Sequence, residues 1–206
     1  MDQDGIAGHW DSAYNDGDTT RSWYQFQPTM SLQMFDRAGV DPERSVVDVG
    51  GGSSPLVDAL LERGHNDVTV LDVSVAGLEL ARRRLGRVAG RVRWLHEDLL
   101  TWRPERTYQV WHDRAVLHFL TDDDSADRYL QTLHHATNPG TVAVLATFAP
   151  DGPRQCSGFD VSRYDAWGLS DLLGKRWLLI AEDHEDHRTP SGVVQPFTWA
   201  ALRRIA

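Results

Sequence analysis

A short apolar segment runs directly into three consecutive glycines, an arrangement that few folds accommodate. Residues 45–49 (Ser-Val-Val-Asp-Val) have the apolar, β-branched character of a buried strand, and Gly50, Gly51 and Gly52 follow at once. The next apolar residues recur at helical spacing, at Leu56, Val57, Leu60 and Leu61. Glycines at such a turn permit unusual backbone angles and close approach of a ligand, and the amide groups that start the helix attract polar groups. The segment therefore predicts a strand–turn–helix unit with a ligand site at the turn.

Predicted strands and helices alternate along the rest of the chain. Further strands are expected at 67–73, 92–95, 108–112, 141–148, 177–182 and 193–201. Further helices are expected after Pro28 and at 76–85, 125–137 and 167–173. Alternation of this kind implies parallel pairing of the strands, with helices on both faces of the sheet. We therefore predict an α/β fold that is doubly wound around a mostly parallel sheet of about seven strands.

The length and composition indicate one domain. A chain of 206 residues with 41% hydrophobic residues can build one sizeable core, whereas two would be difficult. We expect residues 1–20 to be a loose polar lead and residues 21–206 to form the domain. The sequence has no apolar run long enough to span a membrane, and its polar start lacks the pattern of a secretory signal. With a single cysteine, Cys156, the composition fits a cytoplasmic protein.

The formal net charge of −9 argues against a nucleic-acid partner, because polyanions are repelled on average. The one basic cluster comprises Arg82, Arg83, Arg84, Arg87, Arg91 and Arg93. Such a cluster could contact phosphates, but it is also typical of a solvent-exposed helix face, which is the interpretation we favour.

Acidic residues stand at the ends of three predicted strands. Asp72 lies twenty residues after Gly52, where a carboxylate can accept both hydrogen bonds from a ribose diol. Asp98 and Asp113 follow the third and fourth strands. Ligands of doubly wound sheets bind outside the carboxyl ends of the strands. Together with the glycine turn, these acids predict a ligand of the adenosine type.

The turn also discriminates between adenosine-type ligands. A dinucleotide fingerprint requires a third glycine where this chain has Pro55. Asp48 stands two residues before Gly50, and an acid there is unfavourable beside a pyrophosphate. The same acid suits a ligand with an amino group, which it can hold directly or through water. The ammonium group of a methionine moiety would meet that need.

The motifs resemble, in their order along the chain, those of class I S-adenosylmethionine-dependent methyltransferases. The resemblance covers roughly residues 20–200 and departs from the pattern at 53–55, where a third glycine is more common. The similar segments are the acid-x-Gly-x-Gly motif 48–52, the second motif 71–74, the third motif 96–100, the fourth motif 110–114 and the Pro-Gly turn 138–141.

The resemblance implies a Rossmann-like methyltransferase fold and an enzyme that uses S-adenosyl-L-methionine and releases S-adenosyl-L-homocysteine. Asp72 would bind the ribose and Asp98 would meet the adenine amino group. Trp23 and Tyr24 would lie over the cofactor, where an aromatic face also attracts a sulfonium, although they could simply cover the sheet edge. The implied cofactor-binding residues are Trp23, Tyr24, Asp48, Gly50, Gly51, Gly52, Asp72, Val73, Asp98, Leu99 and Asp113.

Methyl transfer mainly requires alignment of the acceptor and exclusion of water, with a base only where the acceptor carries a proton. The candidate catalytic residues follow the fourth strand. Asp113 or His118 could accept a proton, and Arg114 could orient a carboxylate. Alternatively, His118 packs on Phe119, and Asp113 and Arg114 form an ion pair. No metal site is expected. The one candidate pair, His184 and His187, lies three residues apart and would point to opposite faces of a strand.

Four functions remain open from the residues and the resemblance. Methyl transfer to a small molecule is the first, and methyl transfer to a protein lysine is the second, since the acidic charge could attract a basic protein. A nicotinamide-dependent oxidoreductase is the third, but its usual Ser-Tyr-Lys constellation is hard to build when Lys175 is the sole lysine. A non-catalytic nucleoside-binding module is the fourth. Neither a nucleic acid nor a membrane is expected as a partner.

Overall fold

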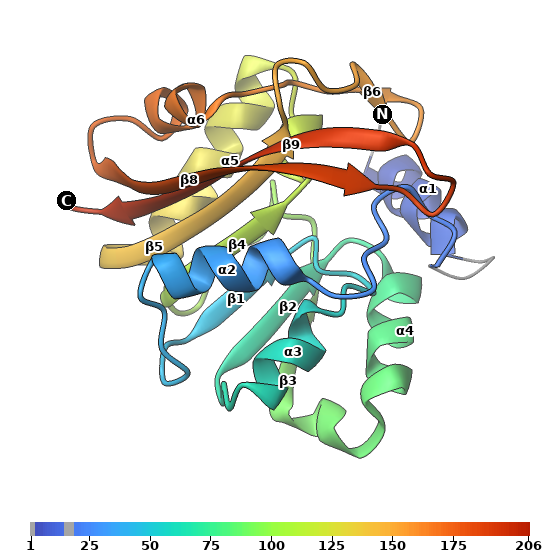
Figure 1. Cartoon of the computed structure of the whole chain (residues 1–206). Helices are drawn as coiled ribbons and strands as arrows, with labels where there is room; N and C mark the ends of the chain where they lie inside the picture. The colour runs from blue at the N-terminus through green and yellow to red at the C-terminus, as the bar shows by residue number, and fades with distance from the viewer. Residues whose placement is uncertain (1–2, 15–18) are drawn as a thin grey trace.

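The computed structural model describes residues 3–14 and 19–206, and its centre is a seven-stranded sheet in the order β3-β2-β1-β4-β5-β9-β8 (Figure 1). β9 (Val194–Arg204) pairs antiparallel with β5, and β8 (Trp177–Arg188) pairs antiparallel with β9. The doubly wound, mostly parallel α/β fold predicted from the sequence is confirmed. The parallel strands are β1 (Val46–Val49), β2 (Val68–Asp72), β3 (Val92–His96), β4 (Tyr108–Arg114) and β5 (Thr137–Phe148).

Helices cover both faces of the sheet (Figure 1). Alternate residues of a strand point to opposite faces, so Val46 and Val110 pack in one core while Val47 and Trp111 pack in the other. One face carries α2 (Thr29–Arg37), α3 (Leu56–Glu62) and α4 (Val75–Leu85); the other carries α5 (Asp123–His135) and α6 (Ala166–Leu173).

Shorter elements complete the domain. Two 3₁₀ turns, η1 (Gly86–Arg91) and η2 (Leu117–Phe119), follow α4 and β4, and a small hairpin joins β6 (Gln155–Cys156) to β7 (Phe159–Asp160). β8 continues to Arg188, beyond its predicted end at residue 182, because it pairs along its length with β9. Within residues 3–14 and 19–206, no helix has the length and apolar character needed to cross a bilayer.

The N-terminal segment differs from its predicted form. Residues 1–20 were expected to be a loose polar lead, but Gln3–Tyr14 forms helix α1; residues 1–2 and 15–18 lie outside the described part. Asp11 attaches this helix to the start of α4, since its Oδ1 accepts hydrogen bonds from Ser74 Oγ (2.6 Å) and Ala76 N (3.0 Å). An isolated helix of this length is marginal in water, so tertiary docking rather than local pattern stabilises it.

A buried hydrogen-bond chain ties α5 to the central strand β4. Trp111 and Tyr129 are fully buried, and the Trp111 Nε1 group donates to Tyr129 Oη over 3.0 Å. The Tyr129 hydroxyl in turn donates to Asp113 Oδ2 over 2.8 Å. Each polar group in this chain therefore has a partner inside the core, as buried polar groups require.

Replacing Tyr129 with Phe removes both hydrogen bonds and leaves an indole N–H and a carboxyl oxygen buried without that partner. We expect the free energy of unfolding to fall by roughly 1–3 kcal/mol. Urea denaturation of the variant measures this loss. Tyr164→Phe is the matched control, because Tyr164 is only half-buried. Equal losses of unfolding free energy in the two variants would contradict a structural contribution of this buried hydrogen-bond network.

Candidate functional site

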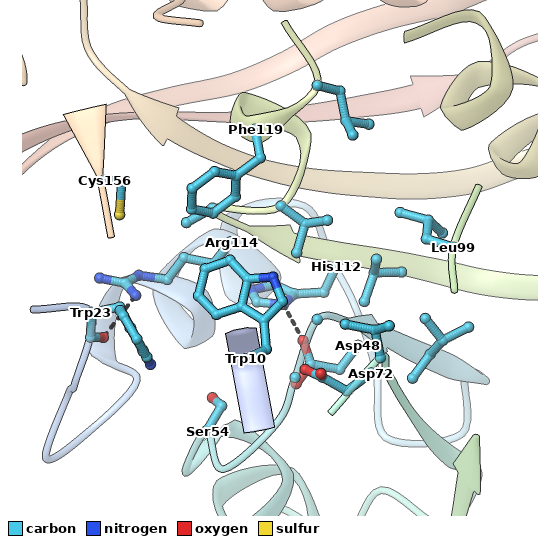
Figure 2. A pocket seen from close by; sticks show the side chains of 18 of the residues that line it. Trp10, Trp23, Asp48, Ser54, Asp72, Leu99, His112, Arg114, Phe119 and Cys156 are labelled. Atoms are coloured by element: carbon cyan, nitrogen blue, oxygen red, sulfur yellow. Dashed lines mark hydrogen bonds and ion pairs between the residues drawn. The ribbon is translucent and has the colours of Figure 1, made fainter. Parts of the chain in front are cut away.

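A cavity of about 510 Å³ lies at the carboxyl ends of the parallel strands, where β1 pairs with β2 on one side and β4 on the other. This is the switch point at which ligands bind in doubly wound sheets, and the volume is typical of small-molecule sites. Helix α1, the segment 23–25 and the β6–β7 hairpin add the outer walls. Figure 2 shows the side chains that converge on this cavity from these separate elements.

The glycine turn forms the floor of the cavity. Gly50 has a positive φ of 64°, a conformation that L-residues rarely adopt, and its N–H donates to Leu71 O over 2.7 Å. A Cβ atom at Gly51 would lie 2.6 Å from Asp48 Oδ2 and 2.7 Å from Val70 Cγ1. Because Gly51 has no side chain, the Asp48 carboxyl has room to lie against the turn.

Asp48 lines the cavity and has one carboxyl oxygen that no described residue pairs with. His112 Nδ1 donates to Asp48 Oδ1 over 2.7 Å (Figure 2). His112 Nε2 lies 3.0 Å from Ser31 Oγ. Asp48 Oδ2 is buried and has no hydrogen-bond partner among the described residues. A buried carboxyl oxygen without a donor is unfavourable, so the site suits a ligand that brings an N–H or ammonium donor.

Asp72 stands beside Asp48 at the same end of the cavity. It accepts a hydrogen bond of 2.7 Å from Ser74 N and another from the Gly52 backbone. Burial raises the pKa of the Asp72 carboxyl to about 7, against the lowering effect of the hydrogen bond from Ser74. Tyr14 from α1 packs against Gly52 at this point. Asp72, the residue predicted to bind the ribose, thus has a buried carboxyl at the end of a strand.

Arg114 contributes the opposite end of the cavity, with the indole of Trp10 lying between it and the two carboxyls (Figure 2). Its Nη1 donates to Trp23 O over 3.0 Å, and its guanidinium carbon lies 4.7 Å from the centre of the Phe197 ring. Burial lowers the pKa of this guanidinium from its ordinary value. The cavity is therefore acidic at one end and basic at the other.

Two of the predicted catalytic residues do not reach the cavity. Strand alternation in β4 turns Asp113 away from the face shared by His112 and Arg114, and its carboxyl accepts from Val116 N, Leu117 N and Tyr129 Oη. Burial raises the pKa of Asp113 to about 6. These bonds, rather than the alternative ion pair with Arg114, occupy its oxygens. The carboxyl acts as a buried link and not as a cavity wall.

His118 packs in the core instead of facing the cavity. Its ring lies 4.5 Å from that of Phe119 and 4.9 Å from that of Phe148. Burial, together with the smaller effect of the positive charge of Arg114, lowers the pKa of His118 to about 3. The structure therefore agrees with the packing alternative for His118.

The other predicted residues converge on the cavity with one exception. Gly52 lies behind Tyr14 and does not line the wall. Asp98 reaches the wall but also closes its own turn, accepting from Leu100 N over 2.9 Å. The predicted residues that line the cavity are Trp23, Tyr24, Asp48, Gly50, Gly51, Asp72, Val73, Asp98, Leu99 and Arg114.

Several residues that line the cavity were not predicted from the sequence. Trp10 and Tyr14 come from α1, and their four-residue spacing in a polar segment was a detectable helical signal. Ser31 and Phe159 reach the cavity from elements that are distant in sequence, so no local pattern marks them. Among the described residues, no group of three or more His, Cys, Asp or Glu side chains could hold a metal ion.

Residues 46–140 match the family model for a methyltransferase domain. A trans-aconitate 2-methyltransferase from Methylobacterium radiotolerans is 33% identical over 124 residues, which are 59% of this chain and 44% of that protein. The eEF1A lysine and N-terminal methyltransferase of Mus musculus is 26% identical over 123 residues, 58% of this chain and 17% of that protein. The chain thus spans less than half the length of these curated relatives.

The fold is similar to that of 1,6-didemethyltoxoflavin-N1-methyltransferase from Burkholderia thailandensis, solved with 1,6-didemethyltoxoflavin and S-adenosylhomocysteine bound. The TM-score is 0.67 at 18% identity, over 100% of this chain and 92% of that one. The predicted Rossmann-like methyltransferase fold is confirmed. With the domain match, the chain is similar to class I S-adenosylmethionine-dependent methyltransferases in sequence over residues 46–140 and in fold.

Replacing Asp72 with Asn should stabilise the ligand-free protein at alkaline pH. The pKa of Asp72 is raised to about 7 in the folded protein, above its ordinary value of 3.8, so the native state retains a proton that the unfolded state releases. The carboxyl therefore lowers stability progressively as pH rises from about 4 to above 7. An amide cannot ionise, so the stability gain over the wild type should be more than about 1 kcal/mol larger at pH 8 than at pH 5.

Thermal unfolding at several pH values measures this difference. Asp36→Asn changes an exposed carboxylate and serves as the control, with little pH dependence in its effect. A gain from Asp72→Asn that is constant between pH 5 and pH 8 would be inconsistent with the raised pKa.

Proposed function

We propose that the chain transfers a methyl group from S-adenosyl-L-methionine to a small molecule and releases S-adenosyl-L-homocysteine. The observation that carries this proposal is the buried, unpartnered Oδ2 of Asp48, which stands beside the glycine turn and the Asp72 carboxyl. We take residues 21–206 as the methyltransferase domain and α1 as its additional cover. We further propose that the protein acts in the cytoplasm, as its single cysteine suggests.

The residues present fit the proposed cofactor. Asp48 Oδ2 would accept from the methionine ammonium, and Asp72 would accept from the ribose hydroxyls. Asp98 and the buried Leu99 would flank the adenine, with the amide groups of the glycine turn close to the carboxylate of the methionine moiety. Trp23 and Tyr24 would cover the site from the N-terminal side.

When bound, the cofactor would supply an electrophilic methyl group on a sulfonium, with the thioether of S-adenosyl-L-homocysteine as the leaving group. The chain aligns the acceptor and excludes water with the aromatic walls that Trp10, Trp23 and Phe119 form. Asp113 and His118 receive no part in proton transfer, because neither lines the cavity.

A small molecule is proposed as the acceptor because α1 and the β6–β7 hairpin wall the cavity on its outer side. A protein lysine is the alternative that the mouse relative favours, since that protein is named for such an acceptor. A nicotinamide-dependent oxidoreductase is disfavoured, because Asp48 would face the pyrophosphate. A nucleoside-binding module without catalysis would bind the cofactor and fail to turn it over.

Isothermal titration of the wild-type protein with S-adenosylhomocysteine and with NAD tests the ligand class. We expect binding of S-adenosylhomocysteine and little or no binding of NAD. The reverse order of affinity would reject the proposed function. Release of S-adenosylhomocysteine in the presence of a pool of small-molecule acceptors then distinguishes an enzyme from a binding module.

Asp48→Asn and Asp72→Ala should weaken ligand binding in different ways. Each substitution removes a charged acceptor and should weaken S-adenosylhomocysteine binding by roughly 1–3 kcal/mol, or about 5- to 150-fold in Kd. 5′-Methylthioadenosine keeps the ribose but lacks the amino acid, so Asp48→Asn should leave its affinity nearly unchanged while Asp72→Ala weakens it. Asp36→Asn is the control for a lost carboxylate. Equal effects of Asp48→Asn on the two ligands would remove Asp48 from the ammonium site.

A further inference from the structure

Positive and negative groups are separated along the cavity. Asp48 and Asp72 lie at one end, at the tips of β1 and β2. The guanidinium of Arg114 lies at the other end beside Cys156, on the far side of Trp10 (Figure 2). The proposed function assigns the acidic end to the cofactor. The basic end is therefore the part of the cavity that remains for the acceptor.

The Arg114 guanidinium has one edge without a hydrogen-bond partner. Nη1 is used, since it donates to Trp23 O. Nε and Nη2 are buried, and neither has a partner among the described residues. These two nitrogens share the edge of the planar group that donates two parallel N–H bonds to a carboxylate.

No carboxylate of the described chain neutralises Arg114 directly. Glu185 is the acid whose charge favours the protonated guanidinium, but it forms no ion pair with it. Instead Glu185 Oε1 accepts from Gln25 Nε2 over 3.0 Å, and Oε2 accepts from Trp199 Nε1 over 2.8 Å. A buried guanidinium without a bonded anion is costly, which favours a partner that arrives with the ligand.

The surroundings of Arg114 favour an apolar body next to the charged group. The Trp10 ring lies 5.7 Å from that of Trp23 and 5.2 Å from that of Phe119, both in edge contact. Phe159 from the β6–β7 hairpin lies beside Phe119, with the two ring centres 6.2 Å apart. These rings form an aromatic wall between the basic end and the acidic end, where an apolar or aromatic ligand would pack.

We infer that the methyl acceptor is a small carboxylic acid with an apolar or aromatic body, whose carboxylate binds side-on to Nε and Nη2 of Arg114. This inference rests on the proposed function, because that function reserves the acidic end for the cofactor. Anchored in this way, the acceptor extends from Arg114 along the aromatic wall toward Asp48 and Asp72. A lysine ammonium would instead meet the like charge of Arg114, so the inference also favours a small molecule over a protein acceptor.

Binding of phenylacetate and phenylacetamide to the protein saturated with S-adenosylhomocysteine tests the inference. The probes have the same aromatic body and differ in the charge of one group. Titrations followed by tryptophan fluorescence and by ligand-observed NMR give the two affinities. We expect phenylacetate to bind at least about tenfold more tightly than the amide, because a bidentate charge-assisted pair forms only with the carboxylate. Equal affinities, or no binding of phenylacetate while S-adenosylhomocysteine binds, would overturn the inference.

Arg114→Gln and Arg114→Lys assign the preference to this side chain. Glutamine removes the charge, and lysine keeps a charge but loses the Nε–Nη2 edge, so each should lower the preference for phenylacetate by about tenfold. Lysine can still donate to Trp23 O, which keeps the test open if the glutamine variant fails to fold. Arg93→Gln, an exposed residue of β3, is the control for a lost positive charge and should retain the preference. An unchanged preference in both Arg114 variants would reject Arg114 as the anchor.

Two further outcomes separate this inference from others. Phenyl phosphate that binds more tightly than phenylacetate would overturn the carboxylate assignment in favour of a phosphorylated acceptor. If the wild-type protein did not bind S-adenosylhomocysteine, the proposed function itself would be rejected. That titration is made first, before phenylacetate or any other acceptor probe is added. The failure of the acceptor inference and the failure of the proposed function therefore give different results.

Discussion

The pairing of β1 with β2 on one side and with β4 on the other is the constraint from which the site follows. This double pairing places Asp48 opposite His112 in register, on the same face of the sheet, and the two side chains meet at 2.7 Å. The connections that leave β1 and β4 cover opposite faces of the sheet, so the strand tips open into a crevice. Without this register, the glycine turn would be an ordinary connection between a strand and a helix.

The cavity contains polar groups that the fold by itself leaves in an unfavourable state. Asp48 Oδ2 and two nitrogens of Arg114 are buried without partners, and Asp72 is buried enough to raise its pKa to about 7. The surrounding sheet compensates for these groups, because both of its faces are covered by continuous apolar cores. A ligand that supplies the missing partners binds the native state only and therefore stabilises it.

Helix α1 shows how the outer wall depends on tertiary contacts. Asp11 occupies the start of α4, and Tyr14 packs on Gly52 beside the ribose-binding candidate Asp72. Trp10 extends toward the aromatic rings near Arg114. A single short helix thus touches both ends of the cavity, although its sequence is polar and has a weak apolar face. Local patterning could not reveal this, since the partners lie more than sixty residues away for Asp11.

Three features are local properties of the chain: the alternation of apolar strands and helices, the glycine turn, and the acids at the strand ends. The amino-acid sequence alone was therefore enough to predict the layered fold and to select Asp48 and Asp72 as candidate ligand-binding residues. Strand periodicity also separates Asp113 from Arg114, because neighbouring residues of β4 face opposite sides. The partners of each polar group, the docking of α1 and the unpaired edge of Arg114 depend on residues far apart in the chain. Only packing decides them, because hydrogen bonds and burial are set by which surfaces meet, and no local pattern records those meetings.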